Sequence, residues 1–291
     1  MADNIRDIKR RIKSVNSTKQ ITHAMELVAS SKLRKARMRA EARKAYFDTM
    51  LSSMREMASH TDRIKNVYLA EREIQNTLFI VITADRGLAG GYNANVIKLV
   101  TSTIKDKSQA QLVTIGSKGR DYFSKRGYNV VDEYTGMSEQ PTYAEASAIG
   151  EMAMKMYGEG LVDEVVLAYT EFVSTISQRA QLIRLLPLSQ EDFDEEEKIV
   201  EGDEIPLVMS FEPSPEALLN YLIPKYICNT IYGAMIEGSA SEQGARRMAM
   251  ETATENANEM IDVLTLYYNR ARQAQITQEL TEIVGGANAL K

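Results

Sequence analysis

The sequence predicts an α/β protein in which two long helices, one at each end of the chain, pair as an antiparallel coiled coil. Three observations lead to this prediction. Residues 1–86 contain no glycine and no proline, the residues that most reliably interrupt a helix. Apolar residues at both ends recur every three or four positions. Between the two ends, short β-rich runs alternate with helical patterns, which is typical of an open α/β domain.

The first helix is predicted over residues 3–60. Its apolar stripe begins with a heptad spacing at Ile5, Ile8 and Ile12, slips in phase near Lys19, and continues to Met57, which still fits a coiled coil with local unwinding. A helix of about 57 residues would span roughly 85 Å, which is too long for the interior of a small domain. The lack of breakers continues past residue 60, so the switch to a β-rich pattern marks where the helix has ended.

Four β-rich runs predict a central domain with a small, Rossmann-like open sheet. They cover residues 77–84, 111–116, 163–174 and 178–188, and the last two are close enough to form a hairpin. Helical patterns follow the first two runs. Thr142 and Glu145 have the spacing of a capping box at the start of a further helix.

The second long helix is predicted over residues 214–284, and Ser214 followed by Pro215 is a good start for it. Unbroken, it would span roughly 105 Å. Pro224 is expected to bend its first turns. Alanines at every fourth position from Ala245 to Ala257 would let another helix approach closely.

The predicted domains are residues 1–65, residues 70–205 and residues 208–291. The central domain is expected at the end of the helix pair where the first helix stops and the second begins. An acidic tract at residues 191–204, with nine acids and one lysine, is expected to be a solvated connection.

Composition excludes several classes of protein. The chain is 44% hydrophobic with regular patterning, so it is not disordered, and it has no apolar run of about 18 residues that could span a membrane. The N-terminus lacks the apolar segment of a signal peptide. The lone Cys228 cannot form an internal disulfide and fits a reducing compartment. His23 and His60 are too far apart for a metal pair on one helix.

Charge is divided unevenly along the chain. Residues 1–65 carry 16 Lys and Arg against 7 Asp and Glu, whereas the remainder carries 19 against 33. This asymmetry fits either a basic element facing an acidic partner or a solvated helix face. The basic run over residues 32–44 could also bind nucleic acid, although the chain as a whole is acidic and no aromatic residue interleaves with the run.

Two further segments carry functional hypotheses. Residues 83–93, TADRGLAGGYN, follow a β-rich run as phosphate-binding loops do, but they match neither common phosphate-binding motif and have no lysine at the turn. A structural strand-to-helix turn is favoured over a nucleotide site. Near the C-terminus, polar residues stand where heptads would place leucine, and such a helix end needs a polar partner around it. They are Asn269, Arg272, Gln273, Thr277 and Glu279.

Over its whole length the sequence resembles the gamma subunit of bacterial F-type ATP synthases. Four segments carry the resemblance: ITHAMELVASSKLRKA (21–36), TADRGLAGGYN (83–93), SEQGARRMAMETATENA (241–257) and YNRARQAQITQELTEIVGGA (268–287). The family often has lysine in place of His23 and cysteine in place of Ala89. Because Cys228 is alone, thiol regulation of the chloroplast type is not expected.

The resemblance implies a rotor subunit present once per complex, with no active site and no cofactor of its own. Its paired helices would stand inside a ring of alternating alpha and beta subunits, and its α/β domain beside the epsilon subunit and the membrane ring of c subunits. An asymmetric surface that presents a different face to each beta subunit would couple ion transport to ATP synthesis or hydrolysis at beta. The chain would be peripheral, on the cytoplasmic side of the cell membrane, and would bind no nucleic acid.

Matches to the family's motifs also assign contact residues. Contacts with the beta subunit are expected at Met25, Lys32, Arg34, Lys35, Arg272, Gln273, Thr277 and Glu279. Phe211 and Glu212 correspond to the family's foot, which meets the c ring or epsilon. Besides the rotor, two other hypotheses stay open: a nucleotide-binding α/β protein with coiled-coil arms, and a nucleic-acid clamp built on the basic helix.

Overall fold

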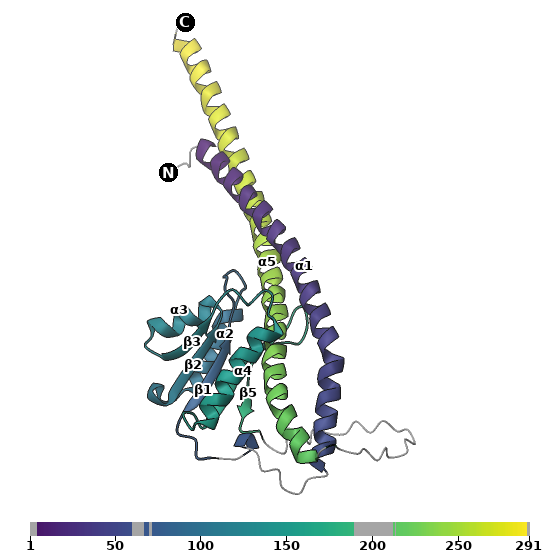
Figure 1. Cartoon of the computed structure of the whole chain (residues 1–291). Coiled ribbons are helices and arrows are strands. Elements are labelled where there is room, and N and C mark those ends of the chain that lie inside the picture. Colours follow the sequence, from purple (N-terminus) through teal and green to yellow (C-terminus); the bar gives the residue numbers. More distant parts are fainter. Residues whose placement is uncertain (1–4, 60–66, 70–71, 189–211, 213, 290–291) are drawn as a thin grey trace. The chain divides into compact units, whose positions relative to one another are not determined.

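The computed structural model describes residues 5–59, 67–69, 72–188, 212 and 214–289 (Figure 1). These residues form two compact units. One is Ser31–Ala245, and the other combines Met1–Ser30 with Arg246–Lys291. The long helices α1 (Ile5–Ser59) and α5 (Pro215–Ala289) contribute to both units. Both predicted helices are thus confirmed, and the acidic tract lies outside the described residues.

Within Ser31–Ala245, a five-stranded sheet has the order β3-β2-β1-β4-β5. Its strands are β1 (Thr77–Ile82), β2 (Ala110–Ile115), β3 (Asn129–Tyr134), β4 (Glu164–Phe172) and β5 (Gln178–Leu186). The first four run parallel, and β5 pairs antiparallel with β4 as the predicted hairpin. The sequence-based reading missed β3, because this edge strand is polar and alternates between exposed and half-buried residues, unlike the apolar runs of the other strands.

Helices cover both faces of this sheet, and alternate residues of β1 separate the two cores. Leu78, Ile80 and Ile82 face α4 (Tyr143–Gly158) and the long helices. Phe79 and Val81 face α2 (Tyr92–Thr103) and α3 (Ser117–Lys125) on the other side. A strand buried on both faces reads as a continuous apolar run, which explains why β1 was predictable.

The capping box predicted for α4 is also present. Thr142 accepts a hydrogen bond from the Glu145 amide at 3.3 Å, and the Glu145 carboxylate accepts one from the Thr142 amide at 2.8 Å. These reciprocal bonds satisfy amides that would otherwise have no partner at the start of the helix. Short 3₁₀ turns, η1 (Val67–Leu69) and η2 (Lys107–Gln109), complete the described elements of this unit.

The segments of α1 and α5 in this unit pack antiparallel. Leu33 and Ala36 of α1 pack on Ala240 of α5. Further along α1, the Phe47 ring stacks on Tyr226 with centroids 5.8 Å apart. Helix α5 continues through Pro224 in the described structure, so the residue expected to bend the first turns does not end the helix.

In the other unit, both helices also carry buried residues. Ile8 and Ala29 are buried on α1, and Met250 and Ala257 are buried on α5. The Oγ1 atoms of Thr22 and Thr254 lie 2.8 Å apart, so one hydroxyl donates to the other across the two helices. Thr254 lies within the series of alanines that was predicted to let another helix approach closely. The direct contact between its short hydroxyl and that of Thr22 on α1 fits this prediction.

Candidate partner-contact sites

The last turns of α5 are exposed throughout. Every residue from 272 to 287 is exposed, including Arg272, Gln273, Thr277 and Glu279. Two of these side chains bond within the helix: Thr277 Oγ1 donates to the Gln273 carbonyl at 2.9 Å, and Gln275 Nε2 donates to Glu279 Oε1 at 2.8 Å. Such bonds between residues four apart fix side chains on the helix surface. Large apolar residues also lie exposed here, at 47% for Ile276 and 58% for Leu280.

The remaining predicted contact residues differ in exposure. Met25 is half-buried, whereas Arg34 and Lys35 are exposed on α1. Glu212 is exposed, and Phe211 lies outside the described residues. His23 is also exposed, with Nδ1 3.2 Å from the Glu26 carboxylate, as expected for a residue on a helix face. The exposed residues can meet a partner as they stand.

Lys32 has a partner within the chain. Its Nζ donates to Glu139 Oε2 at 2.7 Å, and the two side chains are 38% and 32% exposed. An ammonium group has three donors, so this bond leaves capacity for a contact elsewhere. Nothing in the sequence pattern pointed to this pair, because 107 residues separate its members.

Residues 83–93 form a docking turn between the sheet and α5. Ala84, Ala89 and Tyr92 are buried together against Ala245 of α5. A Cβ at Gly238 of α5 would lie 3.2 Å from the Tyr92 hydroxyl, so the absent side chain leaves room for the turn. The small side chains of Ala84, Ala89 and Ala245 complete this contact between the turn and α5.

Asp85 follows β1, and its carboxylate is held by backbone amides of other segments. Its carboxylate accepts hydrogen bonds from the Ser117 amide at 3.0 Å, the Gly136 amide at 3.0 Å and the Ser138 amide at 3.3 Å. Burial opposes the ionised form of Asp85, but these donors outweigh it and lower the pKa of the carboxyl. Three backbone amides near the carboxyl ends of the parallel strands, the region where nucleotides bind in other α/β folds, here donate to a carboxylate of the chain itself. The geometry supports the structural turn.

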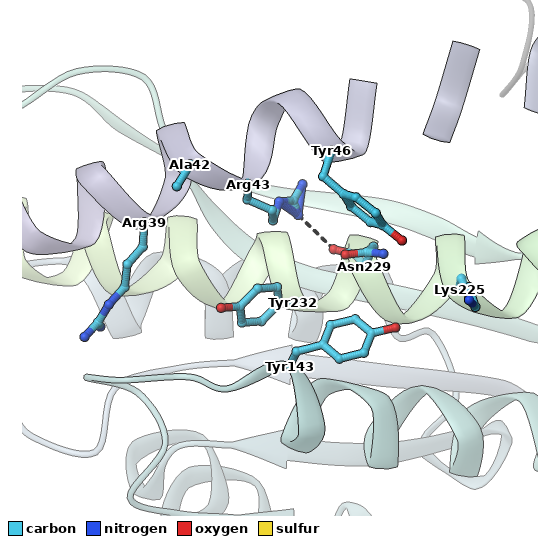
Figure 2. A pocket seen from close by; sticks show the side chains of 8 residues that line it. All are labelled: Arg39, Ala42, Arg43, Tyr46, Tyr143, Lys225, Asn229 and Tyr232. Atoms are coloured by element: carbon cyan, nitrogen blue, oxygen red, sulfur yellow. Dashed lines mark hydrogen bonds between the residues drawn. The ribbon is translucent and has the colours of Figure 1, made fainter. Parts of the chain in front are cut away.

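A cationic cavity opens between α1, α4 and α5 (Figure 2). Its volume is about 640 Å³, within the range of small-molecule sites. The lining residues carry three positive charges and three phenol groups, with no carboxylate. They are Arg39, Ala42, Arg43, Tyr46, Tyr143, Lys225, Asn229 and Tyr232. Chemically, this cavity suits an anionic group.

Two of the cations in this cavity are already engaged. Arg43 Nη1 donates to the Asn229 carbonyl at 2.8 Å, as the dashed line in Figure 2 marks. Burial lowers the pKa of Arg43, with Glu237 acting in the opposite direction. Lys225 Nζ donates to the Tyr221 hydroxyl at 2.6 Å and lies over its ring. Arg39 points away from these groups in Figure 2.

Other site classes find no support among the described residues. In the part of the chain that the structure covers, no cluster of His, Cys, Asp or Glu has the arrangement of a metal site. Likewise, none of the described helices is both long and apolar enough to cross a lipid bilayer.

Cys228 is buried against α4, where a Cβ on Gly150 would lie 2.8 Å from its sulfur.

Comparison with known proteins gives one family. The family model described as ATP synthase matches residues 4–290. The sodium-ion-specific ATP synthase gamma chain of Acetobacterium woodii is 54% identical over the full length of both chains. The ATP synthase gamma chain of Alkaliphilus metalliredigens is 53% identical, again over the full length of both.

Solved structures agree with this result. A chain from the central stalk and c-ring structure of the Tetrahymena thermophila mitochondrial ATP synthase matches with a TM-score of 0.63 at 26% identity, covering 80% of this chain and 99% of that one. A chain of the Euglena gracilis mitochondrial ATP synthase matches in fold, with a TM-score of 0.71 at 20% identity, covering 98% of this chain and 94% of that one. The chain described here therefore belongs to the ATP synthase gamma-chain family.

Proposed function

We propose that the chain is the central-stalk rotor subunit of an F-type ATP synthase. The observation that carries this proposal is the use made of residues 83–93. In this chain they dock the α/β domain on α5, and the Asp85 carboxylate accepts hydrogen bonds from backbone amides of two neighbouring segments. A domain fastened to a long helix in this way is suited to transmit torque, which is the work of a rotor, rather than to bind substrate.

The contacts with the beta subunit are proposed at two places. The exposed end of α5 offers Arg272 and Gln273, with Thr277 and Glu279 as supporting residues. Thr277 bonds to the Gln273 carbonyl, and Glu279 bonds to Gln275. On α1, Met25 and the basic group of Lys32, Arg34 and Lys35 would face acidic surface of the ring. Because these surfaces differ from one another, each rotor angle would present different contacts to a given beta subunit, and affinity would change with angle.

The foot of the rotor is proposed at Phe211 and Glu212, which would meet the c ring or the epsilon subunit. With no spanning helix among the described residues, the chain would reach the membrane through these partners and remain peripheral, on the cytoplasmic side. In this role it couples ion transport to ATP synthesis or hydrolysis carried out by beta. The chain itself would catalyse nothing.

The assembly test is co-purification with alpha and beta subunits followed by measurement of stoichiometry. One copy per complex is the expected result. A chain that purifies without the ring, or in equal number with beta, would contradict the rotor assignment.

The alternative function, nucleotide binding, is favoured by the cationic cavity between α1, α4 and α5. Calorimetry of the full chain with ATP separates the two. A rotor is expected to bind no ATP in the micromolar range. Micromolar ATP binding that is lost in the double variant Arg39→Gln with Lys225→Gln would identify the cavity as a nucleotide site. The control Lys13→Gln should keep such binding. This result would favour the nucleotide-binding function over the rotor.

A further inference from the structure

A short loop, residues 136–139, links the sheet to both long helices within Ser31–Ala245. We call it the bracing loop. Asp85, which follows β1, holds its start: the carboxylate accepts bonds from the amides of Gly136 and Ser138, and the Asp85 amide donates to Ser138 Oγ at 3.2 Å. Gly136 has a φ of +82°, a conformation that glycine adopts without strain. The loop is therefore fixed to the carboxyl end of the central strand.

The far end of the bracing loop contacts both helices through one residue. The Glu139 carboxylate accepts the bond from Lys32 on α1 at 2.7 Å. The Glu139 backbone carbonyl accepts a bond from Ser239 Oγ on α5 at 3.3 Å. A single residue of the α/β domain thus holds α1 by its side chain and α5 by its main chain.

The helices are packed closely where Glu139 holds them. Leu33 and Ala36 follow Lys32 on α1, and Ala240 follows Ser239 on α5, and these three form a buried cluster. Ser239 itself is only 4% exposed. Apolar packing resists separation of the two helices. Because it is non-directional, it opposes sliding or rolling of one helix against the other less strongly. The hydrogen bonds from both helices to Glu139 of the α/β domain oppose sliding and rolling directly.

We propose that Glu139 is a positioning residue of the rotor, which fixes α1 and α5 in register against the α/β domain and so stiffens the path of torque between them. Asp85 is its anchor. This inference rests on the proposed function and deepens it, because it identifies the residue through which the α/β domain is fixed to α1 and α5, the helices that transmit torque to it. The ion pair is partly exposed and adds little to global stability, yet its loss frees a specific relative motion.

The test measures the torsional stiffness of the assembled complex. A probe is attached through Lys98→Cys on α2, whose side chain is exposed, while the only native cysteine is buried. With the ring immobilised, the width of the angular distribution of the probe is recorded while rotation is paused. Glu139→Gln is expected to increase the angular variance by up to about twofold, since it weakens one of the two polar links made by Glu139.

Two further variants keep the inference falsifiable. Glu139→Asp keeps the carboxylate and leaves Lys32 unchanged, so it is expected to give a narrower distribution than Glu139→Gln, which a loss of general stability would not allow. Ser239→Ala is expected to widen the distribution independently, through the α5 link, even where Glu139→Gln does not assemble. The matched control Glu159→Gln removes an exposed charge at the end of α4 and should leave the width unchanged.

The outcomes separate this inference from the function on which it rests. A probe that never turns with ATP in the unsubstituted complex contradicts the rotor assignment itself. A probe that turns, with the same width in Glu139→Gln, Ser239→Ala and the unsubstituted chain, contradicts the role of Glu139 and leaves the rotor intact.

Discussion

The guanidinium of Arg43 on α1 crosses directly over Gly233 on α5. A Cβ on Gly233 would overlap the guanidinium, which donates from Nη1 to the Asn229 carbonyl at 2.8 Å. The same guanidinium lies 4.7 Å from the centroid of the Phe47 ring. Gly233 thus has a specific reason to stand inside a helix where glycine is otherwise unfavourable.

Replacement of this glycine should destabilise the chain. Alanine would gain about 1 kcal/mol of helix propensity, but it would displace the guanidinium and remove its hydrogen bond to the Asn229 carbonyl, which costs about 1–3 kcal/mol. We expect Gly233→Ala to lower the free energy of unfolding in urea. Gly158→Ala is the control, because a Cβ there meets nothing within 4 Å and the substitution should be neutral or stabilising. If Gly233→Ala and Gly158→Ala changed the free energy of unfolding equally, the contact between Arg43 and Gly233 would not contribute to stability.

Asp85 should make stability depend on pH in the acidic range. Hydrogen bonds lower its folded pKa below the unfolded value of about 3.9. The stability it contributes is therefore complete above the unfolded value and is lost as pH falls through the folded pKa. Asp85→Asn should cost about 1–3 kcal/mol near neutral pH, after allowance for partial exposure.

Urea unfolding of both proteins between neutral pH and about pH 2 checks this prediction, with the expected difference shrinking as carboxylates become protonated. Asp262→Asn, an exposed position on α5, serves as the control. A difference that grows on acidification would mean that the carboxylate is not held in its ionised form.

Met25→Lys should impair coupling in the assembled complex. Met25 is half-buried and lies at the position matched to the contact with beta, so a lysine would place a new cation at that contact. ATP-driven ion pumping per ATP hydrolysed should fall, while the chain still assembles. The control is Met38→Lys, at a residue that is 62% exposed on the same helix, and it is expected to lower pumping per ATP less than Met25→Lys does. Normal pumping in Met25→Lys would remove Met25 from the contact set.

Arg272→Ala with Gln273→Ala should lower turnover or coupling without unfolding the chain. Both side chains are exposed, so the free energy of unfolding of the isolated chain should change by less than about 0.5 kcal/mol. Arg270→Ala with Gln278→Ala, on the same stretch of helix, should have a smaller effect on the complex. Unchanged ATP hydrolysis and pumping in the first pair would refute its assigned role.

Strong local patterns made most of the fold predictable from sequence. The apolar run of β1, the capping box at Thr142 and the Ser214–Pro215 start of α5 each express one local rule, and each is found in the structure. Strand β3 was missed because it is an edge strand with no buried residue, in which Asn129, Asp132 and Glu133 interrupt the apolar pattern. The domain boundaries at residues 65, 70, 205 and 208 stay predictions.

The contacts between residues far apart in the chain could not be predicted from the sequence. Lys32 and Glu139, or Arg43 and Gly233, become neighbours only after the helices and sheet have packed, and no spacing rule connects them. The exposed contact residues could be proposed from the family resemblance, whereas the bracing loop required the structure. Glycines in α5 gave the one available signal, because glycine within a helix often marks a close approach.

The most direct test of the central claim is to observe the chain turn. The complex is immobilised through its alpha–beta ring, a probe is attached through Lys98→Cys, and ATP is added. If the chain is the rotor, the probe is expected to rotate continuously in one direction while ATP is hydrolysed and to stop when ATP is removed. A ring that hydrolyses ATP with this chain bound while the probe stays fixed would contradict it.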